Sequence, residues 1–177
     1  LVGIFKDMTD LRRSEVELKK SYEKLQLAMS STISVISLIA ESRDPYTAGH
    51  QRRVADLAAA IAREMEMPEE RVTTIHMAGL IHDIGKINVP AEILSKPGKL
   101  NNGEFALIKN HPETGYNILD KVDFTPPIAQ IVYQHHETMD GSGYPRGIAG
   151  QDIILEARII TVADVVEAMA SQAIPLG

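Results

Sequence analysis

Residues 68–85, PEERVTTIHMAGLIHDIG, contain the pattern that decides the fold class. Pro68 and the two glutamates after it are typical of a helix N-terminus, because proline fits the first turn and carboxylates stabilise its N–H groups. The apolar residues that follow recur at helical spacing, and the segment ends in the polar pair His82-Asp83. The segment therefore predicts a helix that ends in a histidine and an aspartate.

Helical spacing covers most of the chain after residue 47. Four further helices are predicted, in QRRVADLAAAIAREM (51–65), NNGEFALIKNHPETGYNILDKV (101–122), PPIAQIVYQHHE (126–137) and LEARIITVADVVEAMAS (155–171). Loops rich in Gly, Pro and Asn are predicted at 88–102 and 138–152. Because the sequence holds no internal repeat and no strand pair long enough for a sheet, we expect an all-α helical bundle.

The N-terminal part of the chain has a different pattern. Apolar alternation around Ile4 and Phe5, followed by polar residues 7–10, predicts a short strand that leads into a helix cap. A helix of roughly 30 residues is then predicted, because one seam follows a four-three spacing. The seam consists of Leu18, Tyr22, Leu25, Met29, Thr32, Ile36 and Ile39. This seam either packs on its own domain or forms a parallel dimeric coiled coil, and Asp44-Pro45 ends or kinks the helix.

Composition limits the classes of function. The 177 residues are 44% hydrophobic, which suits one soluble globular domain with an appendage. The net charge of −6 disfavours binding to duplex nucleic acid, but a small phosphorylated ligand is compatible if metal ions supply positive charge. Since the chain has no cysteine, any metal must be held by His, Asp and Glu.

The sequence contains no apolar run long enough to span a membrane and no signal-peptide pattern at its start. It begins at Leu1 without a methionine. We therefore expect a piece of a longer, cytoplasmic protein, whose parent could carry membrane segments upstream.

Five of the six histidines lie in compact polar clusters, and one aspartate lies in the apolar face of a predicted helix. These residues are His50, His82 with Asp83, His111, His135 with His136, and Asp164. Adjacent helical residues point about 100° apart, so each pair can reach two neighbouring ions or two positions on one ion. Gly85 and the Gly-Ser-Gly run at 141–143 are expected to free the backbone beside the ligands.

Each cluster also has a simpler reading. A His-Asp pair occurs by chance in many proteins, His111 suits an ordinary loop, and His135-His136 suits a polar helix end. Asp164 could pair with Arg158, and His76 reads as a surface or supporting histidine. Together, however, the imidazoles and carboxylates suit iron, manganese, zinc or nickel, and Asp83 could bridge two ions. Two metal ions held close together polarise phosphoryl groups and activate water, so these residues indicate phosphoester hydrolysis.

The motifs resemble the HD-GYP domains, a branch of the HD metal-dependent phosphohydrolases. The resemblance runs from about residue 42 to 170, through RDPYTAGHQRRVA, AGLIHDIGKI, HPETGYNIL, HHETMDGSGYP and ARIITVADVVEAM in the family's order. It implies a helical bundle with two divalent ions, iron or manganese first and nickel or zinc otherwise. It also implies hydrolysis of the bacterial messenger cyclic di-GMP to pGpG or GMP.

The resemblance assigns roles position by position. Metal ligands match at His50, His82, Asp83, His111, His135, His136 and Asp164, with Asp83 as the bridge. Lys86 matches a lysine that reaches the scissile phosphate, so Lys86 and Asp83 are the expected catalytic residues. The segment GSGYP (141–145) matches the signature loop of the family. This loop implies substrate contacts at Gly143, Tyr144, Pro145 and the adjacent Arg146, and contacts with partner signalling proteins.

The sequence departs from the family pattern in two places. Tyr46 replaces a glutamate that helps some members to hold a third metal, which favours two ions. Ala173 and Leu176 stand where basic residues usually grip the ligand's phosphates. The second departure has two readings: either this segment is divergent, or residues are missing from the sequence at this point. It motivates the alternative of a weak or inactive module that binds cyclic di-GMP or other proteins. A hydrolase for another nucleotide is a separate alternative.

The N-terminal segment VGIFKDMTDLRRSEVEL is similar to the end of a PAS sensor domain and its exit linker. The expected domains are a PAS-like remnant at 1–10, a signalling helix at 11–42 and the HD-GYP domain at 43–177. A homodimer is expected through residues 18–39.

Overall fold

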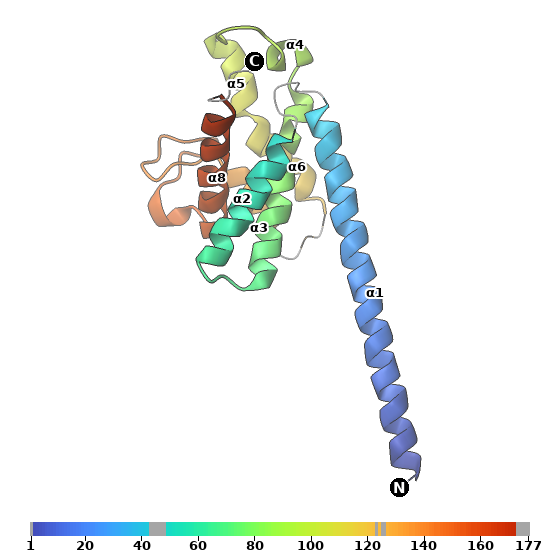
Figure 1. The fold of residues 1–177 in the computed structure, drawn as a ribbon. Helices are drawn as coiled ribbons and strands as arrows, with labels where there is room; N and C mark the ends of the chain where they lie inside the picture. The colour runs from blue at the N-terminus through green and yellow to red at the C-terminus, as the bar shows by residue number, and fades with distance from the viewer. Residues whose placement is uncertain (1, 43–48, 123, 125–126, 173–177) are drawn as a thin grey trace. The chain divides into compact units, whose positions relative to one another are not determined.

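The computed structural model describes residues 2–42, 49–122, 124 and 127–172, with side chains between residues 11 and 171 (Figure 1). Over these ranges it contains helices and no strand, which confirms the predicted all-α class. The elements are α1 (Val2–Glu41), α2 (His50–Glu64), α3 (Glu69–Ile81), η1 (Ile84–Asn88), α4 (Ala91–Leu94), α5 (Asn102–Lys109), α6 (His111–Leu119), α7 (Ile128–Gln134), η2 (Gly150–Asp152) and α8 (Leu155–Gln172). The chain divides into two compact units, Leu1–Val35 and Ile36–Gly177.

Helix α1 begins at Val2, so the strand predicted around Ile4 and Phe5 is wrong. A lone strand would leave its backbone N–H and C=O groups without partners, whereas a helix pairs them within the segment. The helix ends at Glu41, and Asp44 and Pro45 lie outside the described residues. The apolar members of the seam are exposed, for example Leu18 at 72% and Leu25 at 68%.

The second unit has an apolar core built from α2, α3, α7 and α8. In Figure 1, α2 lies between α3 and α8, and these helices pack against one another. The core side chains at 1% exposure or less include Val54, Ala55, Ala58, Ala62, Val72, Ile75, Ala78, Ile128, Ile131, Val132, Ala157, Ile160 and Ala163. The many alanines of α2 permit close helix packing: a Cβ on Gly79 of α3 would lie 2.7 Å from the Cα of Ala55.

Residues 101–122 form two helices, α5 and α6, where the sequence predicted one. Helix α5 starts with a capping box between Asn101 and Glu104. The break falls at Asn110, because Pro112 has no N–H to give to the carbonyl of Ile108. That carbonyl instead accepts a hydrogen bond from His111 Nδ1, so the break also orients a site residue.

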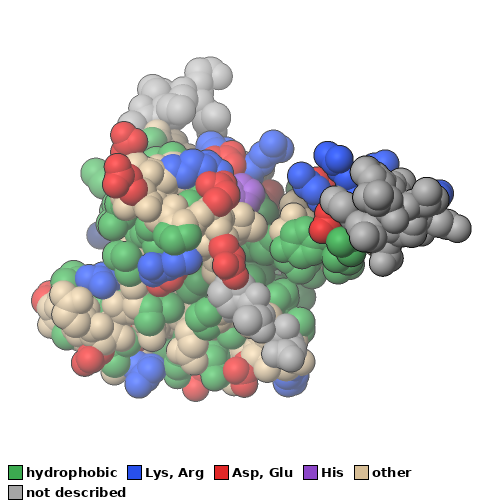
Figure 2. Space-filling model, turned by 90° about the horizontal axis from the view of Figure 1, so that it is seen from below, with side chains coloured by type: hydrophobic (Ala, Val, Ile, Leu, Met, Phe, Trp, Pro, Cys, Tyr) green, Lys and Arg blue, Asp and Glu red, His purple; other side chains and the backbone are tan. Residues whose placement is uncertain are grey.

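The two predicted loops contain short helical turns. Helix α4 and part of η1 lie within 88–102, and η2 lies within 138–152. Basic and acidic side chains are interspersed on the face in Figure 2 rather than gathered into one basic patch. None of the helices in the described part of the chain is both long and apolar enough to traverse a bilayer.

Candidate metal centre

Three buried histidines are oriented in the same way, each by a hydrogen bond to a backbone carbonyl group. Nδ1 of His82, His111 and His135 each lies 2.6–2.7 Å from the carbonyl oxygen three residues earlier, in Gly79, Ile108 and Val132 respectively. A carbonyl only accepts, so each Nδ1 carries the proton and donates it. Each ring then leaves Nε2 free to bind a metal.

The Nε2 atoms face one another without an internal donor. Nε2 of His111 and Nε2 of His135 are 3.1 Å apart, and Nε2 of His82 is buried with no hydrogen-bond partner among the described residues. Burial lowers the pKa of His111 and holds the pKa of His135 well below its usual value. Burial also lowers the pKa of His136, to about 4. Neutral imidazoles whose Nε2 atoms lie this close together fit a bound cation.

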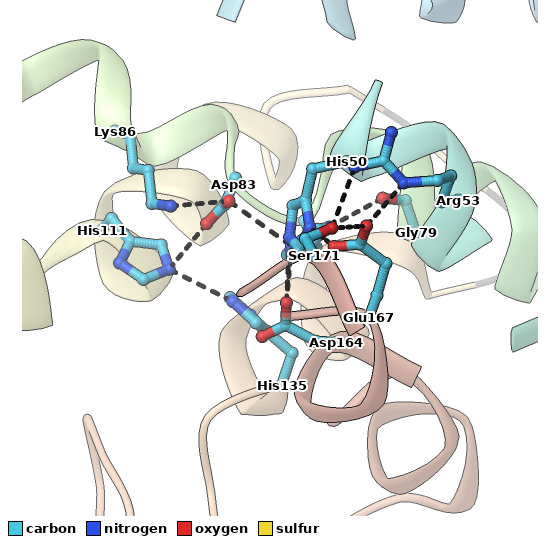
Figure 3. Close-up of polar contacts among 11 residues, drawn as sticks. His50, Arg53, Gly79, Asp83, Lys86, His111, His135, Asp164, Glu167 and Ser171 are labelled. Carbon is cyan, nitrogen blue, oxygen red and sulfur yellow. Dashed lines mark hydrogen bonds and ion pairs between the residues drawn. The ribbon is translucent and has the colours of Figure 1, made fainter. Parts of the chain in front are cut away.

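Asp83 lies at the centre of this cluster (Figure 3). Its Oδ1 is 3.3 Å from His111 Nε2, and its Oδ2 is 3.5 Å from His82 Nε2. Burial alone would raise the pKa of Asp83, but Lys86 and then the surrounding histidines hold it well below the usual range. The side chain is therefore an ionised carboxylate whose two oxygens face different histidines.

The metal-capable residues form two groups that share Asp83. Within each group, the ligand atoms lie within 4.8 Å of one another. One group contains Asp83, His111, His135 and His136, and the other contains His50, His82 and Asp83. A carboxylate common to two sets of imidazoles suits a bridging ligand between two ions.

His50, the first residue of α2, joins the cluster through two acids of α8. Its Nε2 is 3.0 Å from Asp164 Oδ1, and its Nδ1 contacts Glu167. Glu167 also accepts hydrogen bonds from Arg53 Nε at 2.5 Å and from Ser171 Oγ at 2.6 Å. Burial by itself lowers the pKa of His50, but the bonds to Asp164 and Glu167 outweigh it and raise that pKa. A carboxylate on Nδ1 orients a histidine whose Nε2 binds a metal.

Lys86 lies on η1, at the edge of the cluster. Its Nζ donates to Asp83 Oδ2 over 2.7 Å, and the side chain is 22% exposed. The ammonium is therefore next to the carboxylate that both groups share.

Two glycines permit the close approaches that assemble the cluster. A Cβ on Gly85 would overlap the carbonyl oxygen of His111, and a Cβ on Gly143 would lie 2.5 Å from the carbonyl oxygen of His136. The sequence predicts that these two glycines free the backbone, and this reason is wrong. Glycine is needed at both positions because a side chain there would overlap neighbouring backbone atoms. At Gly141, in contrast, φ is +79°, as the turn requires.

The signature loop folds back on the cluster. Glu137 is 2% exposed, and its Oε1 accepts from the backbone N–H of Arg146 over 2.7 Å, which closes the loop. Asp140 caps the turn by accepting from Thr138 Oγ1 and Ser142 N, and these bonds lower its pKa to about 2. These contacts make Glu137 a supporting residue and Asp140 a loop acid.

The loop presents Tyr144 to the cluster. Its ring stacks on His136, with ring centroids 4.8 Å apart, and meets His111 edge-on at 6.4 Å. The following residue, Pro145, is half-buried. The Arg146 guanidinium lies 5.9 Å from the ring centroid of Tyr133. Tyr144 therefore forms a wall of the cluster, while Arg146 lies beyond it.

The structure brings the seven predicted ligands together from α2, α6, α8, the ends of α3 and α7, and the residue that precedes η1. Their metal-binding role stays a prediction. Asp164 pairs with His50 rather than with Arg158, whose Nε is buried and has no hydrogen-bond partner in the part of the chain that the structure describes. His76 pairs with Asp56 at the surface, 3.1 Å away. The departures at Tyr46, Ala173 and Leu176 lie outside the described residues.

Sequence reasoning missed Glu167. Its signal was its position three residues after Asp164, which places both acids on one face of α8. The sequence pattern alone could not show that His50, 117 positions earlier, reaches both.

Comparison with known proteins agrees with this geometry. The family model described as HD domain matches residues 34–175. The chain is 40% identical over 159 residues to the cyclic di-GMP phosphodiesterase response regulator RpfG of Xanthomonas campestris pv. campestris, covering 89% of this chain and 42% of the relative. It is 38% identical over 176 residues to a cyclic di-GMP phosphodiesterase of Thermotoga maritima, covering 97% and 46%. The chain thus spans less than half the length of these relatives.

Another relative is named 3'3'-cGAMP-specific phosphodiesterase 3, from Vibrio cholerae, and is 35% identical over 167 residues, covering 93% of this chain and 36% of the relative. Among solved structures, the HDG"Y"P protein Bd1817 of Bdellovibrio bacteriovorus has a TM-score of 0.61 at 26% identity, covering 69% of this chain and 40% of that one. The HD domain of the Listeria monocytogenes phosphodiesterase PgpH has a TM-score of 0.59 at 22% identity, covering 80% and 74%, and shares the fold. This chain belongs to the HD domain family.

Proposed function

We propose that the chain is the catalytic domain of a metal-dependent phosphodiesterase of the HD-GYP branch, which hydrolyses cyclic di-GMP to pGpG or GMP. The observation that carries the proposal is the pair of ligand groups sharing Asp83. The names of the relatives from Xanthomonas campestris and Thermotoga maritima support the substrate. The chain's net charge of −6 is compatible with metal ions as the main source of positive charge for phosphate.

The two groups would hold two divalent ions, iron or manganese first and nickel or zinc otherwise. His50, His82 and Asp164 would serve one ion, and His111, His135 and His136 the other, with Asp83 between them. Bound ions of this kind supply Lewis acidity at phosphate and lower the pKa of water. The backbone carbonyls and Glu167 hold the imidazoles in the tautomer that presents Nε2.

The chain's own residues would position the substrate. Lys86, 2.7 Å from the shared carboxylate, would donate to an oxygen of the scissile phosphate. Gly143, Tyr144 and Pro145 would form the wall beside it, and Arg146 would contact the more distant part of the nucleotide. Glu137 would keep this wall in place through its bond to the backbone of Arg146.

A second candidate substrate is 3'3'-cGAMP. Relatives from Vibrio cholerae with this specificity in their names are 35% and 38% identical to the chain, which is as similar as several of those named for cyclic di-GMP. Both substrates contain the same phosphodiester linkage type and differ in one base, so the metal centre suits either.

A parallel assay tests the proposal. Protein purified without oxygen is analysed for its metals, and the same sample is given cyclic di-GMP and 3'3'-cGAMP with manganese, iron and nickel. A higher kcat/KM for cyclic di-GMP than for 3'3'-cGAMP supports the proposal. A higher kcat/KM for 3'3'-cGAMP selects the second candidate. Nucleotide binding without turnover would instead identify a receptor module, and the proposal would be abandoned.

We further propose a context for this domain. The exposed seam of α1 would form a parallel homodimer through residues 18–39, and residues 1–10 would be the end of a PAS-like sensor. The signature loop would also contact other signalling proteins. The parent protein would work in the cytoplasm.

A further inference from the structure

Lys109 is a cation beside the candidate metal centre that has no acidic partner among the residues the structure describes. It is the last residue of α5, two positions before His111. Its Nζ lies 5.2 Å from the ring centroid of Tyr144 and 4.9 Å from that of Phe105. Tyr144 in turn stacks on His136. Lys109, Tyr144 and His136 thus form a consecutive series of contacts that leads from solvent to the ligands.

Lys109 differs from Lys86 and Lys96 in whether a carboxylate lies next to its ammonium group. Lys86 and Lys96 each lie 2.7 Å from a carboxylate oxygen. For Lys109, no acidic oxygen of the described residues lies within ion-pair distance, although Glu113 is four positions later. Its recorded contacts are with aromatic rings, which hold the ammonium electrostatically and leave its N–H donors for an anion.

The position of Lys109 decides which part of a ligand it reaches. One aromatic ring separates its ammonium from His136, so it lies outside the cluster that takes the scissile phosphate. A cyclic dinucleotide has a second phosphodiester, whose negative charge also needs a positively charged partner. An ammonium is a compact point charge that suits a phosphate, and its stem is already ordered by the rings.

We propose that Lys109 binds the phosphate of the cyclic dinucleotide that is not being hydrolysed, and that Tyr144 holds the lysine in place for this contact. The inference rests on the proposed function and extends it, because it assigns a subsite for the second phosphate. It makes Lys109 a binding residue with no part in bond cleavage.

Three variants of the metal-loaded protein test the inference. Lys109→Met keeps the apolar stem and removes the charge, Lys109→Arg keeps the charge, and Lys121→Met makes the same change at an exposed lysine just beyond the far end of α6. Each variant is assayed with cyclic di-GMP, which has two phosphodiesters, and with bis(p-nitrophenyl) phosphate, which has one.

For Lys109→Met we expect KM for cyclic di-GMP to rise about 10-fold with kcat changed by less than about 2-fold, since a charged hydrogen bond is lost. Hydrolysis of bis(p-nitrophenyl) phosphate should be unchanged. Lys109→Arg should retain most of the affinity, and Lys121→Met should match the wild type. The wild-type KM should also rise with salt more steeply than that of Lys109→Met.

Other outcomes overturn the inference. Equal losses on both substrates would show that Lys109 only supports the loop, and an unchanged KM would show that it does not contact the nucleotide. If the wild type cleaves bis(p-nitrophenyl) phosphate but no cyclic dinucleotide, the proposed function fails and the subsite fails with it. Activity of the wild type on cyclic di-GMP therefore separates failure of the subsite alone from failure of the proposed function.

Discussion

Nε2 of His111 and Nε2 of His135 lie 3.1 Å apart, while Nδ1 of each ring donates to a backbone carbonyl. Two neutral imidazoles in this arrangement direct their lone pairs at each other inside the protein. This repulsion is relieved when a cation lies between the rings. The folded chain is therefore expected to gain stability from divalent ions.

The first prediction concerns metal removal. At an ion concentration about 100 times Kd, binding to the native state alone contributes about 2.7 kcal/mol. For a chain of this size, that raises Tm by roughly 5 to 10 °C. Thermal unfolding followed by circular dichroism, with manganese and with a chelator, measures the shift. An equal shift in Asp83→Asn would show that the ion acts elsewhere.

The second prediction compares two ligands. Asp83 belongs to both groups, so Asp83→Asn should lower the occupancy of both ions, whereas His136→Ala should affect one. Elemental analysis of the purified variants gives the metal content per chain. Asp56→Asn, which changes a surface partner of His76, should keep the wild-type content. Full metal content and turnover in His136→Ala would contradict the assignment.

The third prediction concerns the carboxylate behind His50. Glu167→Gln removes the charge that fixes the His50 ring, so metal affinity should fall roughly 10- to 100-fold. Competition with a fluorescent chelator measures the change. Glu156→Gln, on the same helix α8 but paired with Arg71, serves as the control. Equal affinities in the two variants would rule out a supporting role for Glu167.

The fourth prediction concerns space in the signature loop. A Cβ at residue 143 would lie 2.5 Å from the backbone of both His136 and Thr138, so Gly143→Ala must displace the loop. A shift of about 1 Å at a reacting site can reduce activity roughly 100-fold. Gly103→Ala adds the same methyl group at 3.4 Å from its nearest neighbour and should keep activity. Circular dichroism should show unchanged helicity in both.

The fifth prediction concerns the seam of α1. A charge at Leu25, which is 68% exposed in the single chain, would be buried in a coiled coil. Leu25→Glu should therefore turn a dimer into a monomer in sedimentation equilibrium. Ser31→Glu, off the seam, should leave the dimer intact. A wild-type protein that sediments as a monomer would refute the homodimer directly.

Helical spacing was sufficient to predict α2, α3, α7 and α8, because each buries one apolar face. It failed at Ile4 and Phe5, where alternation resembles a strand but no partner strand exists in the described chain. It also joined α5 to α6, since spacing does not show that Pro112 leaves the carbonyl of Ile108 without its helical donor.

The site was predictable as a set of residues but not as an arrangement. Motif order brought His50, Asp83 and Asp164 to attention, but only folding shows that the two oxygens of Asp83 face different histidines. Glu167 was missed because its partner is distant in sequence. The need for glycine at position 85 could not be predicted either, because the carbonyl oxygen that leaves no room for a side chain belongs to His111 of another helix.

The sharing of Asp83 has a thermodynamic consequence. If each group holds an ion, the first to bind orders the carboxylate and cancels part of the charge that attracts the second. The two affinities are then linked, and each ion changes the affinity of the other by the same factor. A titration with metal would report the sign of this cooperativity, and exchange of one ion for another element would alter the retention of its neighbour.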